Sequence, residues 1–240
     1  MSYLNTKPLI YGFEQGMMQG VLELVFDYPA NIASQLLEGK IDVGLVPVAV
    51  IPCMSQYSIV SDYCIGCDGE VYSVCLFSDV PLEQVQTILL DYQSKTSVAL
   101  LKVLLREHWH ISPGLAAAPE GYEKNIAGTT AGLVIGDRAI QQHKGSAYVY
   151  DLGQAWKEMT GLPFVFAAWV SNKELDAEWK TAFNAANQFG LSHLNEVISK
   201  IHDHSFDLQT YYTKHISYEL DDAKKRGLQL FLGYLNQSAG

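Results

Sequence analysis

Short apolar runs alternate along the chain with segments whose apolar residues recur every three or four positions. Runs of the first kind are typical of buried strands, and segments of the second kind are typical of amphipathic helices. The predicted strands cover residues 22–27, 41–47, 71–77, 87–91, 133–137, 148–152 and 162–170. The predicted helices cover residues 31–39, 97–108 and 138–143, with helical turns at 81–85 and 155–160. This alternation predicts an α/β fold.

The unit from residue 22 to residue 47 indicates how the strands are arranged. A strand is followed by a helix that Asn31 can cap and Gly39 can end, and then by a second apolar strand. A strand, a helix and a buried strand in this order form a βαβ unit, which implies parallel pairing. We therefore expect mostly parallel sheets with flanking helices.

Beyond residue 171 the pattern changes to helices, at 172–190, 191–202 and 218–235. Since helices alone cannot build a sheet lobe, we expect them to pack against the N-terminal strands. The chain is thus predicted to form a discontinuous first lobe, residues 1–76 plus 169–240, and a second lobe, residues 77–168.

The composition excludes several kinds of partner. A formal net charge of −10 on 240 residues repels nucleic acid and anionic lipid, so we expect neither as a partner. No apolar run approaches the roughly 18 residues of a membrane helix. The first residues lack the basic and apolar regions of a secretory signal, so we expect a cytoplasmic protein.

Cys64 and Cys67 have the C-x-x-C spacing of some metal and redox sites. A zinc site needs a second pair or nearby histidines, and a thioredoxin-like site needs a helix start. Neither accompanies this pair, which lies in a stretch that reads as strand and turn. We therefore predict buried thiols and no metal site.

Two polar stretches, residues 2–9 and 91–97, follow or border predicted strands. The second leads into a helix, where hydroxyls and free backbone N–H groups can bind an anion. An alternative interpretation is that Ser94 or Thr96 only caps that helix. Both roles are compatible with the sequence.

The chain resembles the chorismate dehydratase family of the futalosine route to menaquinone. The resemblance lies in S-Y-L-N-T-K-P-L (2–9), L-L-E-G-K-I-D-V-G-L-V-P-V (36–48), D-G-E-V-Y-S-V-C-L-F-S (68–78), L-D-Y-Q-S-K-T-S-V-A-L (90–100), L-V-I-G-D (133–137), D-L-G-Q-A-W-K-E-M-T-G-L-P-F-V-F-A-A-W (151–169) and Y-E-L (218–220). It implies a two-lobed, type II periplasmic-binding-protein-like fold with the ligand in the cleft between the lobes. It also implies a hydro-lyase that converts chorismate to 3-enolpyruvylbenzoate without a cofactor or metal.

Site residues follow from the resemblance position by position. Asn5 matches the active-site asparagine of the family, and Ser73 matches a serine in the cleft. The polar turn expected to bind a substrate carboxylate is formed by Ser94, Thr96 and Ser97. Further substrate-binding candidates are Thr6, Asp137 and Asp151, of which Asp137 can alternatively cap the following helix.

The matching motifs contain no histidine, and their Asn, Ser and Thr side chains are not bases at neutral pH. We therefore expect catalysis by placement, in which the enolpyruvyl carboxylate of the substrate takes the ring proton. Two alternatives are the sister enzyme 1,4-dihydroxy-6-naphthoate synthase and a non-catalytic solute-binding protein. The former has an S-P-C-P-N-D-T opening and a catalytic histidine, neither of which is found here.

Overall fold

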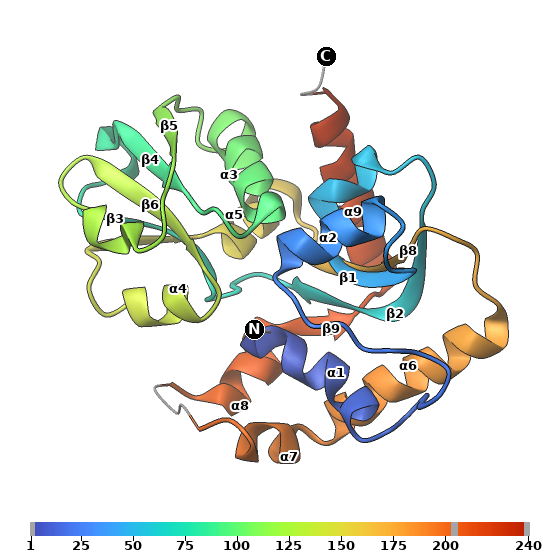
Figure 1. Ribbon diagram of the computed structural model, residues 1–240. Helices are drawn as coiled ribbons and strands as arrows, with labels where there is room; N and C mark the ends of the chain where they lie inside the picture. Colours follow the sequence, from blue (N-terminus) through green and yellow to red (C-terminus); the bar gives the residue numbers. More distant parts are fainter. Residues whose placement is uncertain (1–2, 203–205, 238–240) are drawn as a thin grey trace.

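The computed structural model describes residues 3–202 and 206–237, whose strands form two separate sheets (Figure 1). The strands are β1 (Val43–Pro47), β2 (Ser58–Cys67), β3 (Val74–Ser78), β4 (Thr87–Leu90), β5 (Gly114–Ala117), β6 (Thr130–Ile135), β7 (Tyr148–Asp151), β8 (Phe164–Ser171) and β9 (Ser217–Glu219). The α-helices are α1 (Lys7–Glu14), α2 (Pro29–Leu37), α3 (Lys95–Glu107), α4 (Gly136–Gln142), α5 (Leu152–Thr160), α6 (Ala177–Ser192), α7 (Leu194–Ser199), α8 (Leu208–Thr210) and α9 (Asp222–Gln237). The short 3₁₀ helices are η1 (Leu4–Thr6), η2 (Val48–Cys53), η3 (Leu82–Gln84) and η4 (Tyr122–Asn125), and a π-helical turn, η5, covers Tyr211–His215.

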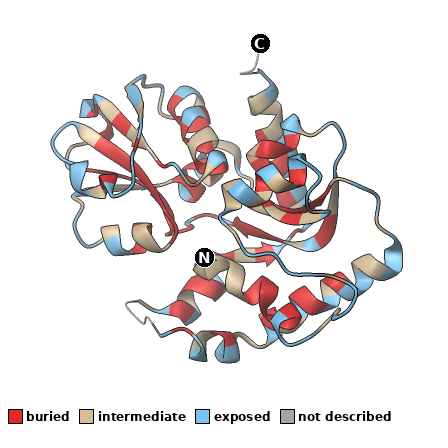
Figure 2. Cartoon of the chain, in the orientation of Figure 1, coloured by how far each residue is buried: buried red, intermediate tan, exposed pale blue. Residues whose placement is uncertain are grey.

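The first sheet has the strand order β1-β8-β2-β9, and all its pairings are antiparallel. β8 lies between β1 and β2, and nearly all of its residues are buried, which explains its long apolar run. Helices from both ends of the chain lie beside this sheet (Figure 1), and much of its surface is buried (Figure 2). α1 and α6 pack closely because Gly12 and Gly190 lie at their contact, where a Cβ would meet backbone oxygens at 2.2 and 1.9 Å.

The second sheet has the order β5-β4-β6-β3-β7. β4 pairs in parallel with β5 and β6, whereas β3 pairs antiparallel with β6 and β7. α3 presents Leu101, Leu104 and Leu105 to the core, as its apolar spacing predicts. The chain passes from the first sheet to the second between β2 and β3, and returns between α5 and β8.

The α/β class is therefore confirmed, but the predicted parallel pairing is wrong for most strands. Residues 23–27 form no strand in the described structure, so the predicted βαβ unit at 22–47 is absent. β1 pairs instead with β8, from much later in the chain. An apolar run reveals that a strand is buried, but it does not reveal the direction of the neighbouring strand.

The helix after residue 28 begins at Pro29, a favoured first position, with Tyr28 as its N-cap residue. Asn31 therefore does not cap it. Gly39 lies just beyond its end with φ +69°, as expected for a helix-ending glycine. The predicted lobe boundary at 168/169 falls within β8, which belongs to the first sheet, and the division into two lobes stays a prediction.

Cys64 and Cys67 lie on β2 as free, fully buried thiols, which confirms the predicted burial of the C-x-x-C pair. Burial raises the pKa of Cys64 to about 12, so this thiol stays protonated. Across the described residues, no helix combines the length and apolar character that crossing a membrane requires.

Candidate active site

A hollow of about 90 Å³ lies where η1, the loop before β3 and the start of α3 come together. Asn5 and Thr6 of η1 line it together with Ser73, Ser94 and Ser97. Five of the predicted site residues, from three distant parts of the sequence, thus share one hollow. Apolar side chains from β1, β2 and β8 complete its wall.

Two tyrosines fix the turn that carries Asn5. Tyr212 donates a hydrogen bond to the backbone oxygen of Leu4, and Tyr218 donates one to the backbone oxygen of Asn5, each at 2.9 Å. Both tyrosines are buried and come from the C-terminal part of the chain. These two hydrogen bonds fix the backbone of the turn, and the Asn5 side chain lines the hollow.

A third tyrosine links the two predicted catalytic residues. The Tyr211 hydroxyl donates to Ser73 Oγ at 2.9 Å and also lies near the Asn5 side chain. Burial raises the pKa of Tyr211, so its hydroxyl remains protonated and able to donate. The Ser73 carbonyl accepts from Gly136 N at 2.7 Å, which fixes the loop before β3.

At the start of α3, Ser94 both caps the helix and lines the hollow. Ser94 Oγ accepts from Ser97 N at 3.1 Å as the N-cap and donates to Ser97 Oγ at 2.8 Å, while both serines line the hollow. Thr96 lies outside the hollow lining. Its buried Oγ1 accepts from Ala49 N of η2 at 3.1 Å, and so joins α3 to the element that follows β1.

The two predicted aspartates also lie outside the hollow lining. Asp151 caps α5 by accepting from Gln154 N, and it accepts from Val71 N and Tyr72 N at 3.1 and 2.7 Å. It thereby holds the loop that leads to Ser73, with Tyr72 in a left-handed conformation (φ 65°). Burial raises the Asp151 pKa, and these N–H donors counteract the rise.

Asp137 does not cap α4, whose N-cap residue is Ile135 with no side-chain cap. Its Oδ1 instead accepts from Leu4 N at 3.4 Å and so contacts η1 from the second sheet's side of the hollow. For Asp137 and Asp151, as for Thr96, the structure shows contacts that shape the site, and their predicted binding of a ligand stays a prediction.

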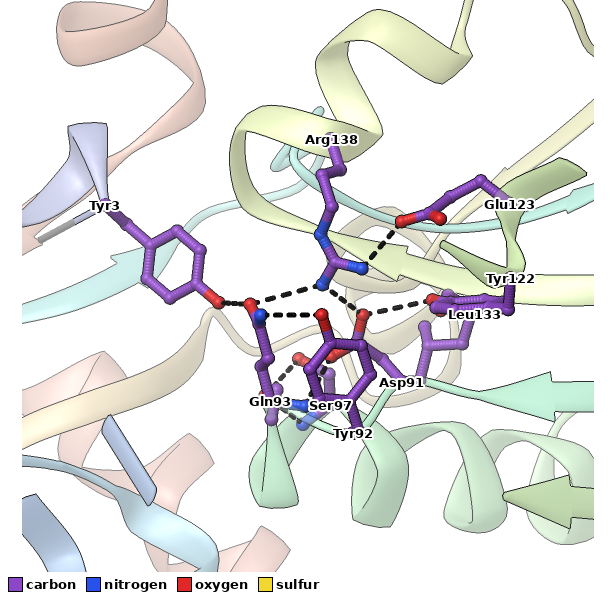
Figure 3. A network of polar contacts seen from close by, with 10 residues as sticks. Tyr3, Asp91, Tyr92, Gln93, Ser97, Tyr122, Glu123, Leu133 and Arg138 are labelled. Carbon is purple, nitrogen blue, oxygen red and sulfur yellow. Dashed lines mark hydrogen bonds and ion pairs between the residues drawn. The ribbon is translucent and has the colours of Figure 1, made fainter. Parts of the chain in front are cut away.

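A charged network supports the rim of the hollow (Figure 3). Arg138 forms 2.6 Å ion pairs with the buried Asp91 and with Glu123, and donates to Gln93 Oε1 at 3.2 Å. Tyr3 of the N-terminal turn donates to the same Gln93 oxygen, so the network reaches across from the second sheet to η1. Burial raises the pKa of Asp91, and the Arg138 charge opposes that rise.

Residues 1–237 match a family model described as menaquinone biosynthesis. The chain belongs to the menaquinone biosynthesis family. A curated relative, chorismate dehydratase of Thermus thermophilus, is 30% identical over 259 residues, covering 95% of this chain and 91% of the relative.

Solved structures show the fold that this member of the menaquinone biosynthesis family adopts. A protein from Archaeoglobus fulgidus matches with a TM-score of 0.72 at 12% identity, covering 99% of this chain and 95% of its own. The periplasmic aliphatic sulphonate binding protein SsuA from Escherichia coli matches with a TM-score of 0.60 at 13% identity, covering 97% and 83%. The periplasmic-binding-protein-like fold is thereby confirmed.

The residues that the sequence did not reveal are mainly aromatic. Tyr211, Tyr212 and Tyr218 support Asn5 and Ser73, and Tyr3 and Gln93 meet across the hollow. The sequence offered one signal, a cluster of tyrosines in a C-terminal segment with few other strand or helix features. Tyrosine hydroxyls seek partners when they are buried, so such a cluster favours a polar network.

Proposed function

We propose that this member of the menaquinone biosynthesis family is a chorismate dehydratase, a hydro-lyase that releases water from chorismate to give 3-enolpyruvylbenzoate. The family match and the Thermus relative support the assignment. The proposal gives no step to a metal or cofactor. A cytoplasmic location remains a prediction.

The proposed mechanism rests on one observation: nearly all the side chains that line the hollow are non-ionisable. Of the described residues that line it, Tyr3 has the one ionisable side chain, and burial, with the charge of Asp91, raises the pKa of that side chain. The remaining polar groups are the amides and hydroxyls of Asn5, Ser73, Ser94 and Ser97, together with Thr6 and Gln93. Such groups can bind a dianion, but at neutral pH they cannot remove a proton from carbon.

The proton acceptor is therefore assigned to the substrate. Dehydration breaks a ring C–H bond and the C–O bond to the ring hydroxyl, and the C–H electron pair becomes the new ring double bond. The enolpyruvyl carboxylate accepts the ring proton and passes it to the departing hydroxide, which leaves as water. In this scheme Asn5 orients that carboxylate, and the serines at the start of α3 hold the ring carboxylate.

The size of the hollow indicates that binding requires an opening movement. A volume of about 90 Å³ has room for only a handful of waters, since one water needs about 10–15 Å³ of such space. Chorismate, with its ring, its enolpyruvyl ether and two carboxylates, needs more space. Contacts such as Tyr3 with Gln93 must separate before the substrate enters, which is the behaviour of a hinged cleft.

Turnover of chorismate tests the proposal directly. The purified protein is incubated with chorismate, and the loss of its absorbance is followed while the product is identified by mass spectrometry and NMR. Formation of 3-enolpyruvylbenzoate is the expected result. Chorismate that is bound but unchanged indicates a solute-binding protein, and chorismate that is neither bound nor changed is the result expected of the sister synthase; either contradicts the proposal.

The role of Asn5 is tested by Asn5→Asp, which keeps the shape of the side chain but adds a negative charge beside a dianion. We expect kcat/KM to fall by at least about 10²-fold, the scale for losing one placed donor. Asn236→Asp, on an exposed helix end, adds the same charge elsewhere and serves as the matched control. Near-normal turnover in the Asn5 variant would contradict the assigned mechanism.

A further inference from the structure

Tyr72 lies at the centre of a tight turn directly before Ser73. Its φ of 65° falls in the left-handed region, and Ser73 N donates a hydrogen bond to the Val71 carbonyl at 2.7 Å. A bond between residues two positions apart, around a residue with this φ, indicates the strained form of the γ-turn, which is rare in proteins. A bulky side chain at such a φ is an outlier that calls for a physical reason.

Both backbone polar groups of Tyr72 are bound to side chains. Tyr72 N donates to Asp151 Oδ2 at 2.7 Å, and the Tyr72 carbonyl accepts from His143 Nε2 at 2.8 Å. Since a carbonyl oxygen only accepts, Nε2 is a ring nitrogen of His143 that carries a proton. A rotation of Tyr72 into an ordinary extended conformation would disturb both hydrogen bonds as well as the turn.

Two histidines stack on the Tyr72 ring. The His143 ring lies with its centroid 4.0 Å away and its plane tilted by 7°, and the His215 ring lies at 5.0 Å and 29°. His143 follows α4 beside the second sheet, whereas His215 belongs to η5, which packs against β9 of the first sheet. The turn itself lies on the connection from β2 to β3 (Figure 1). It is therefore held from both sheets at a point where the chain crosses between them.

The turn and its neighbours bind every polar group of Ser73. Its N–H is engaged in the turn, its carbonyl accepts from Gly136 N at 2.7 Å, and its Oγ accepts from the Tyr211 hydroxyl at 2.9 Å. Tyr211 and His215 belong to the same π-helical turn, so one short element restrains both Ser73 and the residue before it. Ser73, thus restrained, lines the hollow.

We propose that Tyr72 is a positioning residue for the dehydration, whose strained turn fixes Ser73 in the hollow. The two histidines and Asp151 hold Tyr72 in this turn. Strained conformations persist only where the surrounding structure over-determines them, and they gather at active sites. A loop with no positioning task could contain glycine here, because glycine adopts this φ without strain. The inference rests on the proposed function, since it takes the placement of Ser73 to matter for turnover of chorismate.

Two substitutions of Tyr72 test the role of the turn itself. Tyr72→Ala and Tyr72→Gly both remove the ring, and they differ only in the Cβ that makes a left-handed backbone costly. We expect kcat for chorismate to be about 5- to 30-fold higher in Tyr72→Gly than in Tyr72→Ala, because that cost falls on alanine alone. If packing of the ring were its only role, Tyr72→Ala would be at least as active, since glycine makes the loop more flexible. Equal kcat values, or a higher value in Tyr72→Ala, overturn the proposal.

His143→Ala tests the restraint on the turn, and His193→Ala is its matched control. The His193 ring also stacks on an aromatic ring, that of Phe189 at 4.0 Å, and its Nδ1 lies 2.7 Å from the Phe189 carbonyl oxygen, outside the residues that line the hollow. We expect His143→Ala to lower kcat about 10- to 100-fold with KM changed less than about threefold, and His193→Ala to leave both unchanged. In a Tyr72→Gly background, His143→Ala should have little further effect. An equal kcat in the two single histidine variants overturns the proposal.

Hydrogen exchange separates a failure of this inference from a failure of the proposed function. If the unaltered protein turns over chorismate and the two histidine variants share its kcat, the positioning role alone fails. If the unaltered protein does not turn over chorismate, the proposed function fails, and amide exchange in residues 71–73 decides whether the histidines hold the turn. We expect that exchange to be faster in His143→Ala than in His193→Ala, and equal exchange overturns the restraint.

Discussion

The change Tyr211→Phe removes one hydroxyl from the centre of the candidate site and leaves the ring in place. The Tyr211 ring is buried, and its hydroxyl donates to Ser73 Oγ at 2.9 Å. Without it, Ser73 Oγ keeps a 3.5 Å contact with the Val71 carbonyl but has lost its donor. A neutral hydrogen bond contributes about 0.5–1.5 kcal/mol net, and an unsatisfied buried partner costs about 1–3 kcal/mol.

We therefore expect the free energy of unfolding to fall by about 1–2 kcal/mol. For a chain of this length the corresponding fall in Tm is about 2–8 °C, which differential scanning calorimetry measures directly. The loss should be no larger, because the aromatic packing of Tyr211 against Phe206 and Tyr212 is retained in the variant.

The effect on activity should exceed the effect on stability. The Tyr211 hydroxyl donates to Ser73 and lies near the Asn5 side chain, so its loss affects two groups that the mechanism requires in fixed positions. A misplacement of about 1 Å can cost 10²-fold, so we expect kcat/KM for chorismate to fall by about 10- to 100-fold, mainly through kcat.

Tyr150→Phe is the matched control. Its hydroxyl accepts from Leu82 N at 2.8 Å on the second sheet, outside the residues that line the hollow, so the same chemical change costs stability there without touching the site. If both variants lose comparable Tm and both keep normal kcat/KM, Tyr211 only stabilises the fold and the reasoning about Asn5 placement is refuted.

Three further predictions concern two residues near the hollow and the metal-free mechanism. Asp151→Asn replaces by a neutral amide a carboxylate that accepts from Val71 N and Tyr72 N, at a cost of about 1–3 kcal/mol. Tm in thermal unfolding should therefore fall by several degrees. An unchanged Tm would contradict the support assigned to Asp151. Thr96→Val leaves Ala49 N without its acceptor and should raise KM about three- to tenfold with little change in kcat, and a fall in kcat alone would count against a role in closure. Dialysis against a chelator such as EDTA should leave turnover unchanged, and activity that disappears and returns with added metal would refute the metal-free mechanism.

Much of the fold could be predicted because local pattern determines it. The α3 helix follows from its apolar spacing, and Gly39 marks the end of α2. Strand direction could not be predicted, because β1 and β2 both pair with β8, whose place in the sheet depends on a chain that has crossed to the second sheet and returned. The order of the strands along the sequence does not show that the chain returns to the first sheet at β8.

The residues of the candidate site likewise fall into two groups, those that a sequence motif indicates and those that only the structure reveals. Asn5, Ser73 and Ser94 could be identified because they lie in motifs that resemble a known family. Tyr211 and Tyr218 could not, because their roles depend on contacts more than a hundred residues away in sequence. Thr96 and Asp151 illustrate a different limit: the structure shows that they bind backbone groups around the site, whereas their predicted contact with a ligand stays a prediction.

The direct contacts in and around the hollow have a consequence for catalysis. Tyr3 meets Gln93, Leu4 N donates to Asp137 and Thr96 accepts from Ala49 N, so elements of the two sheets are joined without a ligand. Each such hydrogen bond contributes on the order of 1 kcal/mol net. Breaking them therefore costs only a few kcal/mol, and an open conformation can be populated as a minor state without a ligand. On the proposed mechanism, we expect chorismate to replace contacts at the rim by bridging Asn5 and Ser73 to the serines of α3, with one carboxylate toward each side. We expect a ligand with one carboxylate to occupy one side only, so that selectivity for the dianion depends on closure as well as on single contacts.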